Sequence, residues 1–372
     1  MAFLLVFLLA FSMTEGGPLK RGAKGSAPAA LPAAEKTDWH DVQKLSLKGL
    51  GWEELHQSYT RLPAKAETMV TAPVWKLSKH SAGVYVQFKT NSKSIKVRWN
   101  VRANNSFNHM APTAVKGVDL YAKNGQEWKW VGVGKPSGKA NEEVIASSMP
   151  AADREFMLYL PLYDGVDTVS IGVEAGATMQ DVNPEKEKPL VFYGTSIVQG
   201  ACASRAGMAY PAIIGRTLHQ EVVNLGFSGN GKMDVELAHL LAEIDANMYV
   251  LDCMPNMTPE EVEPKVVEFV KVLREKKPGV PIVVVENINY AHSWIDTRVA
   301  GLVKSKNQHL KNAYKTLTAS GIKNLHYVSN QNLALASGEG TVDGIHLTDL
   351  GFVQIACELT KEIKKVEKKT KR

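Results

Sequence analysis

Hydrophobic and polar residues alternate with a period of two through much of the region from about residue 40 to residue 175. In residues 94–101 (SIKVRWNV), the apolar side chains fall on one face and the polar side chains fall on the other. This alternation predicts a half-buried antiparallel strand. Further strands with turn residues between them are predicted over residues 84–90, 118–123, 128–133, 157–163 and 166–173. The sequence therefore predicts an all-β sandwich, jelly-roll-like, over residues 39–180. Its Trp and Tyr side chains are expected in the core or on the sheet surface, with a sugar-binding platform as the alternative.

The pattern changes after residues 181–189 (DVNPEKEKP), a charged stretch with two prolines. Short apolar segments now alternate with amphipathic segments of helix length, such as residues 208–219 and 259–277. This alternation predicts a flavodoxin-like, doubly wound parallel sheet with strand order 2-1-3-4-5 over residues 189–366. Ligands of such sheets bind at the carboxyl ends of the strands. The five strands are predicted over residues 190–194, 221–227, 248–253, 282–287 and 324–329.

Composition and charge agree with two globular domains. The chain has 372 residues, of which 44% are hydrophobic and 22% are charged, and its formal net charge is +6. Residues 361–372 contain seven Lys or Arg and two Glu, so almost all of the positive excess lies in one terminal segment. We interpret this run as a solvated helix end, with contact to an anionic surface as the alternative. The sequence predicts no nucleic-acid partner and leaves the oligomeric state open.

The chain begins with an apolar run, MAFLLVFLLAFSM, that is too short to span a bilayer. We interpret residues 1–16 as a signal peptide and residues 17–38 as a flexible leader, which predicts export to the periplasm or the extracellular space with no stable membrane span after cleavage. No Lys or Arg precedes the apolar run. A mis-assigned start or a short membrane anchor is therefore the alternative.

Candidate chemistry begins directly after the first strand of the predicted parallel sheet. Residues 194–200 (GTSIVQG) place Ser196 on a glycine-flanked turn between a strand and a helix. Such a turn exposes the hydroxyl at the sheet edge, and the helix N-terminus offers backbone N–H groups to a developing anion. A serine in this position also commonly caps a helix, so the motif by itself carries little weight.

Two further loops follow the second and third strands. Residues 224–231 (NLGFSGNG) contain Gly229, whose backbone N–H can approach a substrate closely, and residues 252–257 (DCMPNM) contain Asn256, whose amide can donate a hydrogen bond. Both groups are candidate oxyanion donors. Taken singly, the glycines would be read as ordinary turn residues and Asn256 as an ordinary loop residue.

A candidate base lies in residues 343–352 (DGIHLTDLGF), just before the last amphipathic helix. Asp343 precedes His346 by three residues, so its carboxylate can hydrogen-bond the imidazole, fix its tautomer and stabilise the imidazolium. A lone Asp and His at this spacing would more often form a turn with a surface histidine.

The four segments, in this order, resemble the four blocks of the SGNH hydrolase superfamily (GDSL-like hydrolases), with the resemblance covering residues 190–360. It implies that Ser196 is the nucleophile, that Ser196, Gly229 and Asn256 supply the oxyanion hole, and that Asp343 and His346 are the acid and base. Residues 117–123 (GVDLYAK) resemble the GxDLY motif of a β-rich domain fused to such enzymes, especially in exported bacterial esterases. The chain departs from the family pattern at Thr195, in place of the Asp of the GDSL signature, and at residues 254–255 (MP), in place of a glycine-containing entry to the asparagine block.

The remaining candidate residues are a loop pair and three cysteines. Asn108 and His109 lie in a polar loop that is predicted to overhang the site and bind substrate, with a hydrogen-bonded loop histidine as the plainer interpretation. Cys202 and Cys253 follow neighbouring strands, so a disulfide and two buried thiols are both open, and Cys357 is expected in the core. No cysteine has metal-ligand spacing with a His pair, so no metal site is predicted. The acyl transfer expected of this triad needs neither a metal nor an organic cofactor.

These features predict a serine esterase that hydrolyses small acyl esters, preferably acetyl esters of carbohydrate, through an acyl-enzyme. The carbohydrate is implied by the resemblance to exported esterases with an added β-domain, and by the polar loop. Two alternatives are an acyltransferase with the same triad and a non-catalytic carbohydrate-binding protein on an esterase fold.

Overall fold

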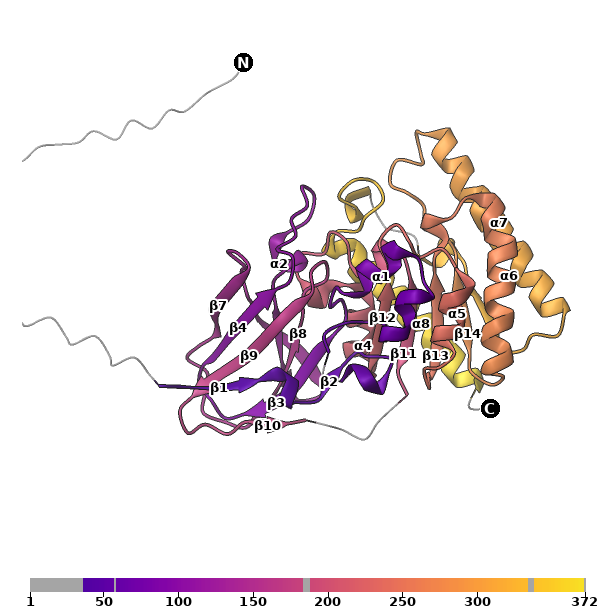
Figure 1. Ribbon diagram of the computed structural model, residues 1–372. Coiled ribbons are helices and arrows are strands. Elements are labelled where there is room, and N and C mark those ends of the chain that lie inside the picture. Colours follow the sequence, from indigo (N-terminus) through magenta and orange to yellow (C-terminus); the bar gives the residue numbers. More distant parts are fainter. Residues whose placement is uncertain (1–35, 57, 183–187, 334–337, 371–372) are drawn as a thin grey trace, which may run out of the picture. The chain divides into compact units, whose positions relative to one another are not determined.

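A computed structural model describes residues 36–56, 58–182, 188–333 and 338–370 of the chain (Figure 1). The predicted signal peptide and nearly all of the predicted leader lie outside the described residues. Among the helices that are described, none is long and apolar enough to cross a membrane.

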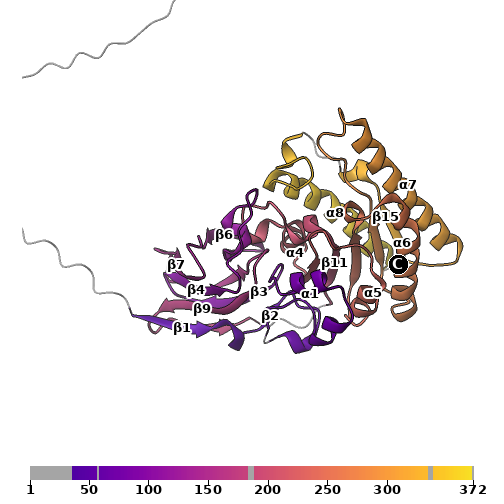
Figure 2. The same ribbon diagram turned by 45° about the horizontal axis from the view of Figure 1, so that its top comes forward.

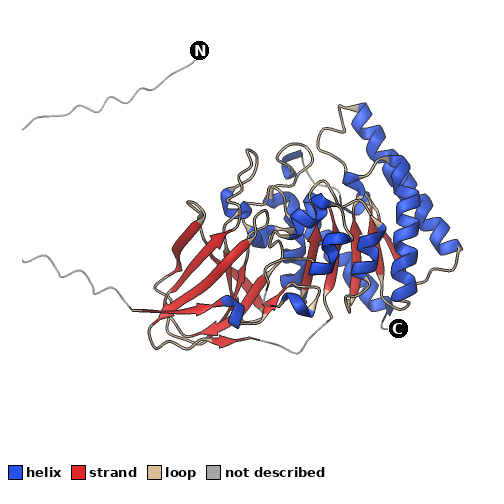
Figure 3. Ribbon diagram, in the orientation of Figure 1, coloured by secondary structure: helices blue, strands red, loops and turns tan. Residues whose placement is uncertain are grey.

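The first region is the predicted β-sandwich, built from two antiparallel sheets. Figure 3 shows that strands dominate this region, whereas most helices surround the parallel sheet. Alternate side chains of the strands fill the space between the sheets, where Phe88, Trp99 and Phe156 are buried. One sheet has the order β1 (Thr37–Asp41), β9 (Val166–Glu174), β4 (Ile95–Val101) and β7 (Ala140–Ala146). The other has the order β10 (Gln180–Asp181), β3 (Tyr85–Thr90), β8 (Arg154–Tyr159), β5 (Asp119–Asn124) and β6 (Glu127–Val133), with β2 (Leu47–Lys48) paired to β3.

The second region is a five-stranded parallel sheet with the expected order 2-1-3-4-5, which confirms the predicted fold class. One face of the sheet packs on α4 (Tyr210–Leu218) and α8 (Asp349–Thr370), and the other packs on α5 (Val235–Leu241) and α6 (Pro259–Lys276). Helix α7 (Thr297–Ala319) packs along α6, and Figure 2 shows α8 on the opposite side of β15 from these two helices. The strand order is β12 (Val222–Gly226), β11 (Leu190–Gly194), β13 (Met248–Asp252), β14 (Ile282–Val285) and β15 (Leu325–Val328).

The register of three neighbouring strands sets the position of the site. Gly194 at the end of β11 lies opposite Gly226 of β12 and Asp252 of β13. The three loops that carry Ser196, Gly229 and Asn256 therefore leave the sheet at the same level. Phe227 N–H also donates to the Gly194 carbonyl at 2.9 Å, which ties two of these loops together.

Residues 49–81 differ from the prediction, because they form no strand at any described position although they lie inside the predicted sandwich. They contain η2 (Glu53–Leu55), η3 (Ala64–Thr68) and α1 (Ala72–Ser78), and they pack on the parallel-sheet region. Trp52 Nε1 donates to Glu243 at 2.8 Å, and Gly49 N–H donates to Glu221 at 2.8 Å. These residues do not show the period-two alternation. The prediction included them in the sandwich only because they lie between segments that do show it.

Candidate active site

Ser196 is the first residue of α3 (Ser196–Gln199), and one residue, Thr195, separates it from the end of β11. The Thr195 side chain caps the helix by accepting the Ile197 N–H at 3.3 Å, so the residue that departs from the GDSL signature acts as a helix cap. Gly231 packs against this turn, since a Cβ there would lie 2.0 Å from the Gly194 carbonyl oxygen. Ser196 is therefore held at the sheet edge by a tightly packed turn.

His346 and Asp343 lie in the loop before α8 and complete a chain of hydrogen bonds. The Ser196 Oγ is 2.9 Å from His346 Nε2, and His346 Nδ1 is 2.7 Å from Asp343 Oδ2. Because a carboxylate can only accept, Nδ1 carries the proton and Nε2 is free to accept from the serine hydroxyl. The structure thus brings together the serine, histidine and aspartate that the sequence predicted.

Asp343 is held in its ionised form. Burial alone would raise the pKa of Asp343, but hydrogen bonds from the His346 ring and from the backbone N–H groups of His346 and Ile345 outweigh it and lower this pKa to about 2. The two backbone N–H groups donate to Oδ1 at 2.8 and 3.0 Å, so Oδ2 is directed at the ring. The carboxylate orients the imidazole and stays charged while it does so.

Asn256, in η5 (Met254–Asn256) after β13, contacts the loop that contains Gly229. Its amide is best oriented with Oδ1 toward the backbone N–H groups of Gly229, Asn230 and Gly231, at 3.3, 3.1 and 3.2 Å, since the opposite orientation would set N–H against N–H. Nδ2 is then the end of the amide that can donate to a ligand. Gly229 has φ +71°, a conformation that favours glycine. Its N–H already donates to Asn256 Oδ1, at 3.3 Å, the longest of the three distances.

The β-sandwich contributes Asn108 and His109 through the loop after β4. Buried Asp164 holds the base of this loop by accepting the backbone N–H groups of Ala103 and Asn105 at 3.0 and 2.7 Å. The exposed His109 ring lies with its centroid 5.9 Å from that of His346, and its Nδ1 is 2.9 Å from Asn108 Oδ1. The loop therefore places a sandwich residue beside the candidate base.

Gln199, which the sequence analysis did not select, connects the candidate nucleophile to its surroundings. It is completely buried on α3, and its Oε1 accepts the Ser228 N–H at 3.0 Å. Its Nε2 donates to the Leu162 carbonyl at 3.0 Å and lies 3.2 Å from His80 Nδ1. Burial, followed by the nearby Arg61 charge, lowers the pKa of His80 to about 3, so its ring is neutral and can accept. One polar side chain thereby joins the nucleophile helix, the Gly229 loop and two segments from the first half of the chain.

Arg61 supports the same loop from residues 49–81. Its buried guanidinium donates to the Asn224 and Gly226 carbonyls at 3.1 and 2.6 Å, and its Cζ lies 4.9 Å from the centroid of the Phe227 ring. It also donates to the His80 and Leu77 carbonyls at 2.9 and 2.7 Å. Sequence inspection offered no signal for Arg61, because its partners lie far along the chain and carry no side-chain motif.

The GxDLY motif joins the sandwich to the parallel-sheet region. Buried Asp119 accepts the Gly207 N–H at 2.8 Å and the Trp130 Nε1–H at 2.9 Å, and it lies 3.3 Å from Arg205 Nε. The Tyr121 ring packs under Arg216, 4.0 Å from its guanidinium carbon. The acidic and aromatic residues of the motif thus have a structural role at a domain contact.

The three cysteines are free thiols in this structure. Cys253 points into the core on the α6 face of the sheet and Cys202 packs on the α4 face, so the two thiols do not pair. Cys357 is exposed, and the prediction that it lies in the core was wrong. The apolar stripe of α8 consists of Phe352, Ile355, Ala356, Leu359 and Ile363, which turns position 357 outward.

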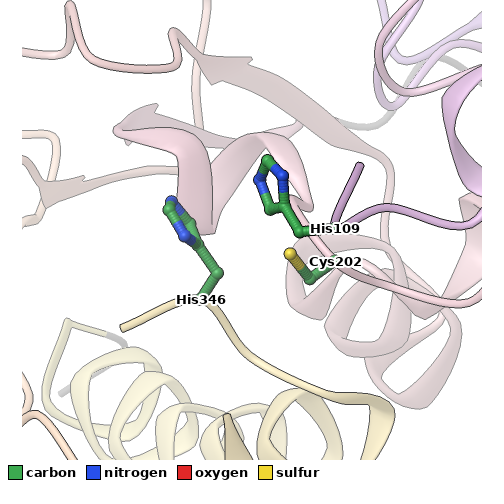
Figure 4. A group of neighbouring side chains, drawn as sticks. All are labelled: His109, Cys202 and His346. Carbon is green, nitrogen blue, oxygen red and sulfur yellow. The ribbon is translucent and has the colours of Figure 1, made fainter. Parts of the chain in front are cut away.

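One set of side chains in the described part of the chain has the chemistry and spacing to hold a metal ion. Figure 4 shows His109, Cys202 and His346 facing a common space, with one donor atom of each within 4.8 Å of the others. Burial, followed by the charge of Asp343, raises the pKa of Cys202 to about 12, so in the free protein the thiol is protonated and a poor nucleophile. Sequence spacing could not reveal this set, because its members come from three distant segments.

The fold and the site define a class: a flavodoxin-like sheet that presents a serine, a histidine and an aspartate at its carboxyl edge. Residues 187–364 match the GDSL-like lipase/acylhydrolase family, and residues 37–179 match the N-terminus of SGNH hydrolase-type esterases. A Bacteroides ovatus protein described as a GDSL-like lipase is 37% identical to the chain, covers 90% of it and 98% of its own length, and superposes with a TM-score of 0.86. The chain belongs to the GDSL-like lipase/acylhydrolase family, a family of hydrolases.

More distant structures share the fold. A salicylyl-acyltransferase from a tetracycline biosynthetic pathway is 18% identical, with a TM-score of 0.68 over 83% of this chain and 90% of its own. A family two carbohydrate esterase from Clostridium thermocellum is 13% identical, with a TM-score of 0.55 over 76% of this chain and 91% of its own. No curated protein sequence matches the chain significantly.

Proposed function

We propose that this protein is a serine esterase that removes small acyl groups, acetyl above all, from carbohydrate. The observation that carries the proposal is the hydrogen-bonded chain from Ser196 Oγ through His346 to Asp343, at 2.9 and 2.7 Å. In this geometry the imidazole can take the serine proton while the carboxylate stabilises the resulting imidazolium.

The proposed reaction has two acyl-transfer steps. Ser196 Oγ attacks the ester carbonyl while its proton moves to His346 Nε2, and the alcohol leaves with that proton, which gives the acyl-enzyme. Water then attacks the acyl carbon, with His346 again as the base, and releases the carboxylic acid. The oxyanion is met by the Ser196 N–H and by Asn256 Nδ2, with the Gly229 N–H shared between the oxyanion and Asn256 Oδ1.

The surroundings of the site favour a polar polymer over a lipid as substrate. The overhanging loop presents the polar side chains of Asn104, Asn108 and His109 to solvent. Trp294, 82% exposed, lies in the same loop as His292, whose ring packs against Gly344 of the His346 loop. An exposed indole suits the apolar face of a sugar, and the polar side chains of the other loop suit its hydroxyl groups.

The decisive experiment measures acetate release from a panel of acetylated glycans and from 4-nitrophenyl acetate. Wild type is compared with Ser196→Ala and with Ser320→Ala, a matched control at an exposed serine. We expect the first variant to lose at least about 10³-fold in kcat and the control to match wild type. Equal rates for wild type and Ser196→Ala would overturn the proposal.

The same assay separates the other two functions. With an added alcohol acceptor, a transferase would form the new ester at the expense of free acetate, whereas a hydrolase would continue to release acetate. A non-catalytic binding protein would bind glycan equally well with and without Ser196→Ala and would release no acetate from any substrate.

Export is part of the proposal and rests on the apolar run in residues 1–16. It predicts that the protein purified from outside the cytoplasm of an expressing bacterium begins after this run. Mass spectrometry of the intact protein tests it, and a cytoplasmic full-length chain would contradict it.

A further inference from the structure

His109, Cys202 and His346 come from three separate parts of the chain and converge beside the proposed nucleophile (Figure 4). His109 is carried by the sandwich loop, Cys202 follows α3, and His346 precedes α8. One donor atom of each lies within 4.8 Å of the other two. Two imidazoles and a thiol are the ligands that zinc prefers in proteins.

Both histidines are already oriented as metal ligands usually are. His346 Nδ1 pairs with Asp343 Oδ2 at 2.7 Å, and His109 Nδ1 pairs with Asn108 Oδ1 at 2.9 Å. A metal-bound histidine characteristically directs its second ring nitrogen at an oxygen acceptor, which fixes the tautomer and raises the basicity of the ligating nitrogen. In each ring, Nε2 is therefore the nitrogen with an available lone pair.

Cys202 is held in place by its backbone and by its neighbours. It adopts φ +69°, a left-handed conformation that is uncommon for residues other than glycine, and it is only 8% exposed. Two residues later, the Ser204 N–H donates to Asp349 at 2.9 Å, which ties the Cys202 turn to the start of α8. The thiol is thus fixed between the sandwich loop and the His346 loop.

We propose that His109, Cys202 and His346 form a site for a zinc-type divalent cation, and that the bound ion switches off the esterase. Zn–N bonds of about 2.0 Å and a Zn–S bond of about 2.3 Å require the three donors to draw closer than they are, and the exposed His109 side chain can make most of this movement. The thiol releases its proton to solvent as the sulfur–metal bond forms, and a water molecule completes the coordination. His346 Nε2 then has no lone pair for the Ser196 proton. Only this inhibition rests on the proposed function, because binding does not depend on catalysis.

The first test measures binding directly. Zinc chloride is titrated by calorimetry into the full chain and into Cys202→Ser and His109→Gln, with Cys357→Ser and His309→Gln as controls at an exposed cysteine and a partly exposed histidine outside the cluster. We expect about one ion per wild-type chain, at least tenfold weaker binding by the two cluster variants, and wild-type affinity in both controls. Wild-type affinity in both cluster variants, or no zinc binding by wild type, would overturn the proposal.

The second test measures inhibition. Zinc should inhibit 4-nitrophenyl acetate hydrolysis by wild type, and a chelator should restore the rate. Cys202→Ser should hydrolyse the ester normally without zinc and need at least tenfold more zinc for half inhibition. Equal sensitivity of the two proteins to zinc would overturn the inhibitory role.

If wild type shows no esterase activity, the proposed function fails while the calorimetric result still decides the metal site. Circular dichroism verifies the fold of each variant, and His109→Gln provides the binding result if Cys202→Ser does not fold.

Discussion

Gln199 accepts the backbone N–H of Ser228 through its buried Oε1 at 3.0 Å, and so joins the helix that begins at Ser196 to the loop that contains Gly229. The same side chain reaches Leu162 and His80 in the first half of the chain through its Nε2. The nucleophile and the oxyanion loop are thus held in register by a residue that is itself anchored outside the parallel-sheet region. A site assembled in this way depends on the domain contact as well as on its own loops.

Replacing Gln199 by Leu should therefore lower kcat more than it changes KM. The variant keeps the side-chain volume but leaves the Ser228 N–H and the Leu162 carbonyl without a partner, which costs on the order of 1–3 kcal/mol of stability. A small displacement of Ser196 relative to the oxyanion donors should reduce kcat by about 10–100-fold. Steady-state kinetics and urea unfolding measure the two effects. Gln308→Leu, at an exposed glutamine that bonds only Asn312 among the described residues, is the control, and a Gln199→Leu variant that raised KM alone would contradict a positioning role.

Two substitutions of Asn256 should distinguish its proposed role as an oxyanion donor from its role in supporting the Gly229 loop. Asn256→Ala removes both and should lower kcat by about 10²–10³-fold. Asn256→Asp keeps an oxygen that accepts the backbone N–H groups of residues 229–231, but it replaces the donating Nδ2 by a second oxygen that repels the oxyanion. We expect Asn256→Asp to fold at least as stably as Asn256→Ala and to be no more active. Activity near that of wild type in Asn256→Asp would show that the amide does not donate in the transition state.

Asp343→Asn should keep the fold and lose most of the activity. Oδ1 of Asp343 accepts the backbone N–H groups of Ile345 and His346, so an Asn that keeps those bonds turns its NH2 toward the His346 ring. The ring then adopts the tautomer with the proton on Nε2, which cannot accept from Ser196 Oγ, and kcat should fall by about 10³–10⁴-fold. Rates with 4-nitrophenyl acetate test this, and a loss of less than tenfold would argue that the carboxylate is dispensable.

The pH dependence of the free energy of unfolding should reflect the ionisation of the buried Asp119 carboxyl. Burial raises its pKa from 3.8 to about 6, although Arg205, Gly207 and Trp130 each act to lower it. The pKa of Asp119 in the folded protein lies above its value in the unfolded chain. The contribution of the protonated Asp119 carboxyl to stability is therefore fully present below about pH 4 and is lost as the pH rises through about 6. The free energy of unfolding of wild type should therefore fall relative to that of Asp119→Asn between these values, by at most about 3 kcal/mol. Urea unfolding at several pH values tests it, and a difference that stays constant or grows with pH would show that Asp119 remains ionised throughout.

The sequence by itself determined the two kinds of domain and the candidate serine, histidine and aspartate. Periodicity reports which faces of a strand or helix are buried, and this is a local property that can be read without knowing the partner. Ser196, Asp343 and His346 could be identified from the sequence for the same reason, since each lies in a short segment with its own recognisable pattern of turn residues.

Only the tertiary structure decided which side chains support and surround those residues. Gln199 and Arg61 act through carbonyl and N–H groups that lie far away in the chain, and Cys202 comes near His109 and His346 only in the folded protein. No local pattern identifies such partners. The exposure of Cys357 and the packing of residues 49–81 on the parallel-sheet region were missed for a related reason. An apolar side chain has many ways to be buried, and the choice among them is made by the shape of the surface it meets, which exists only after the chain has folded.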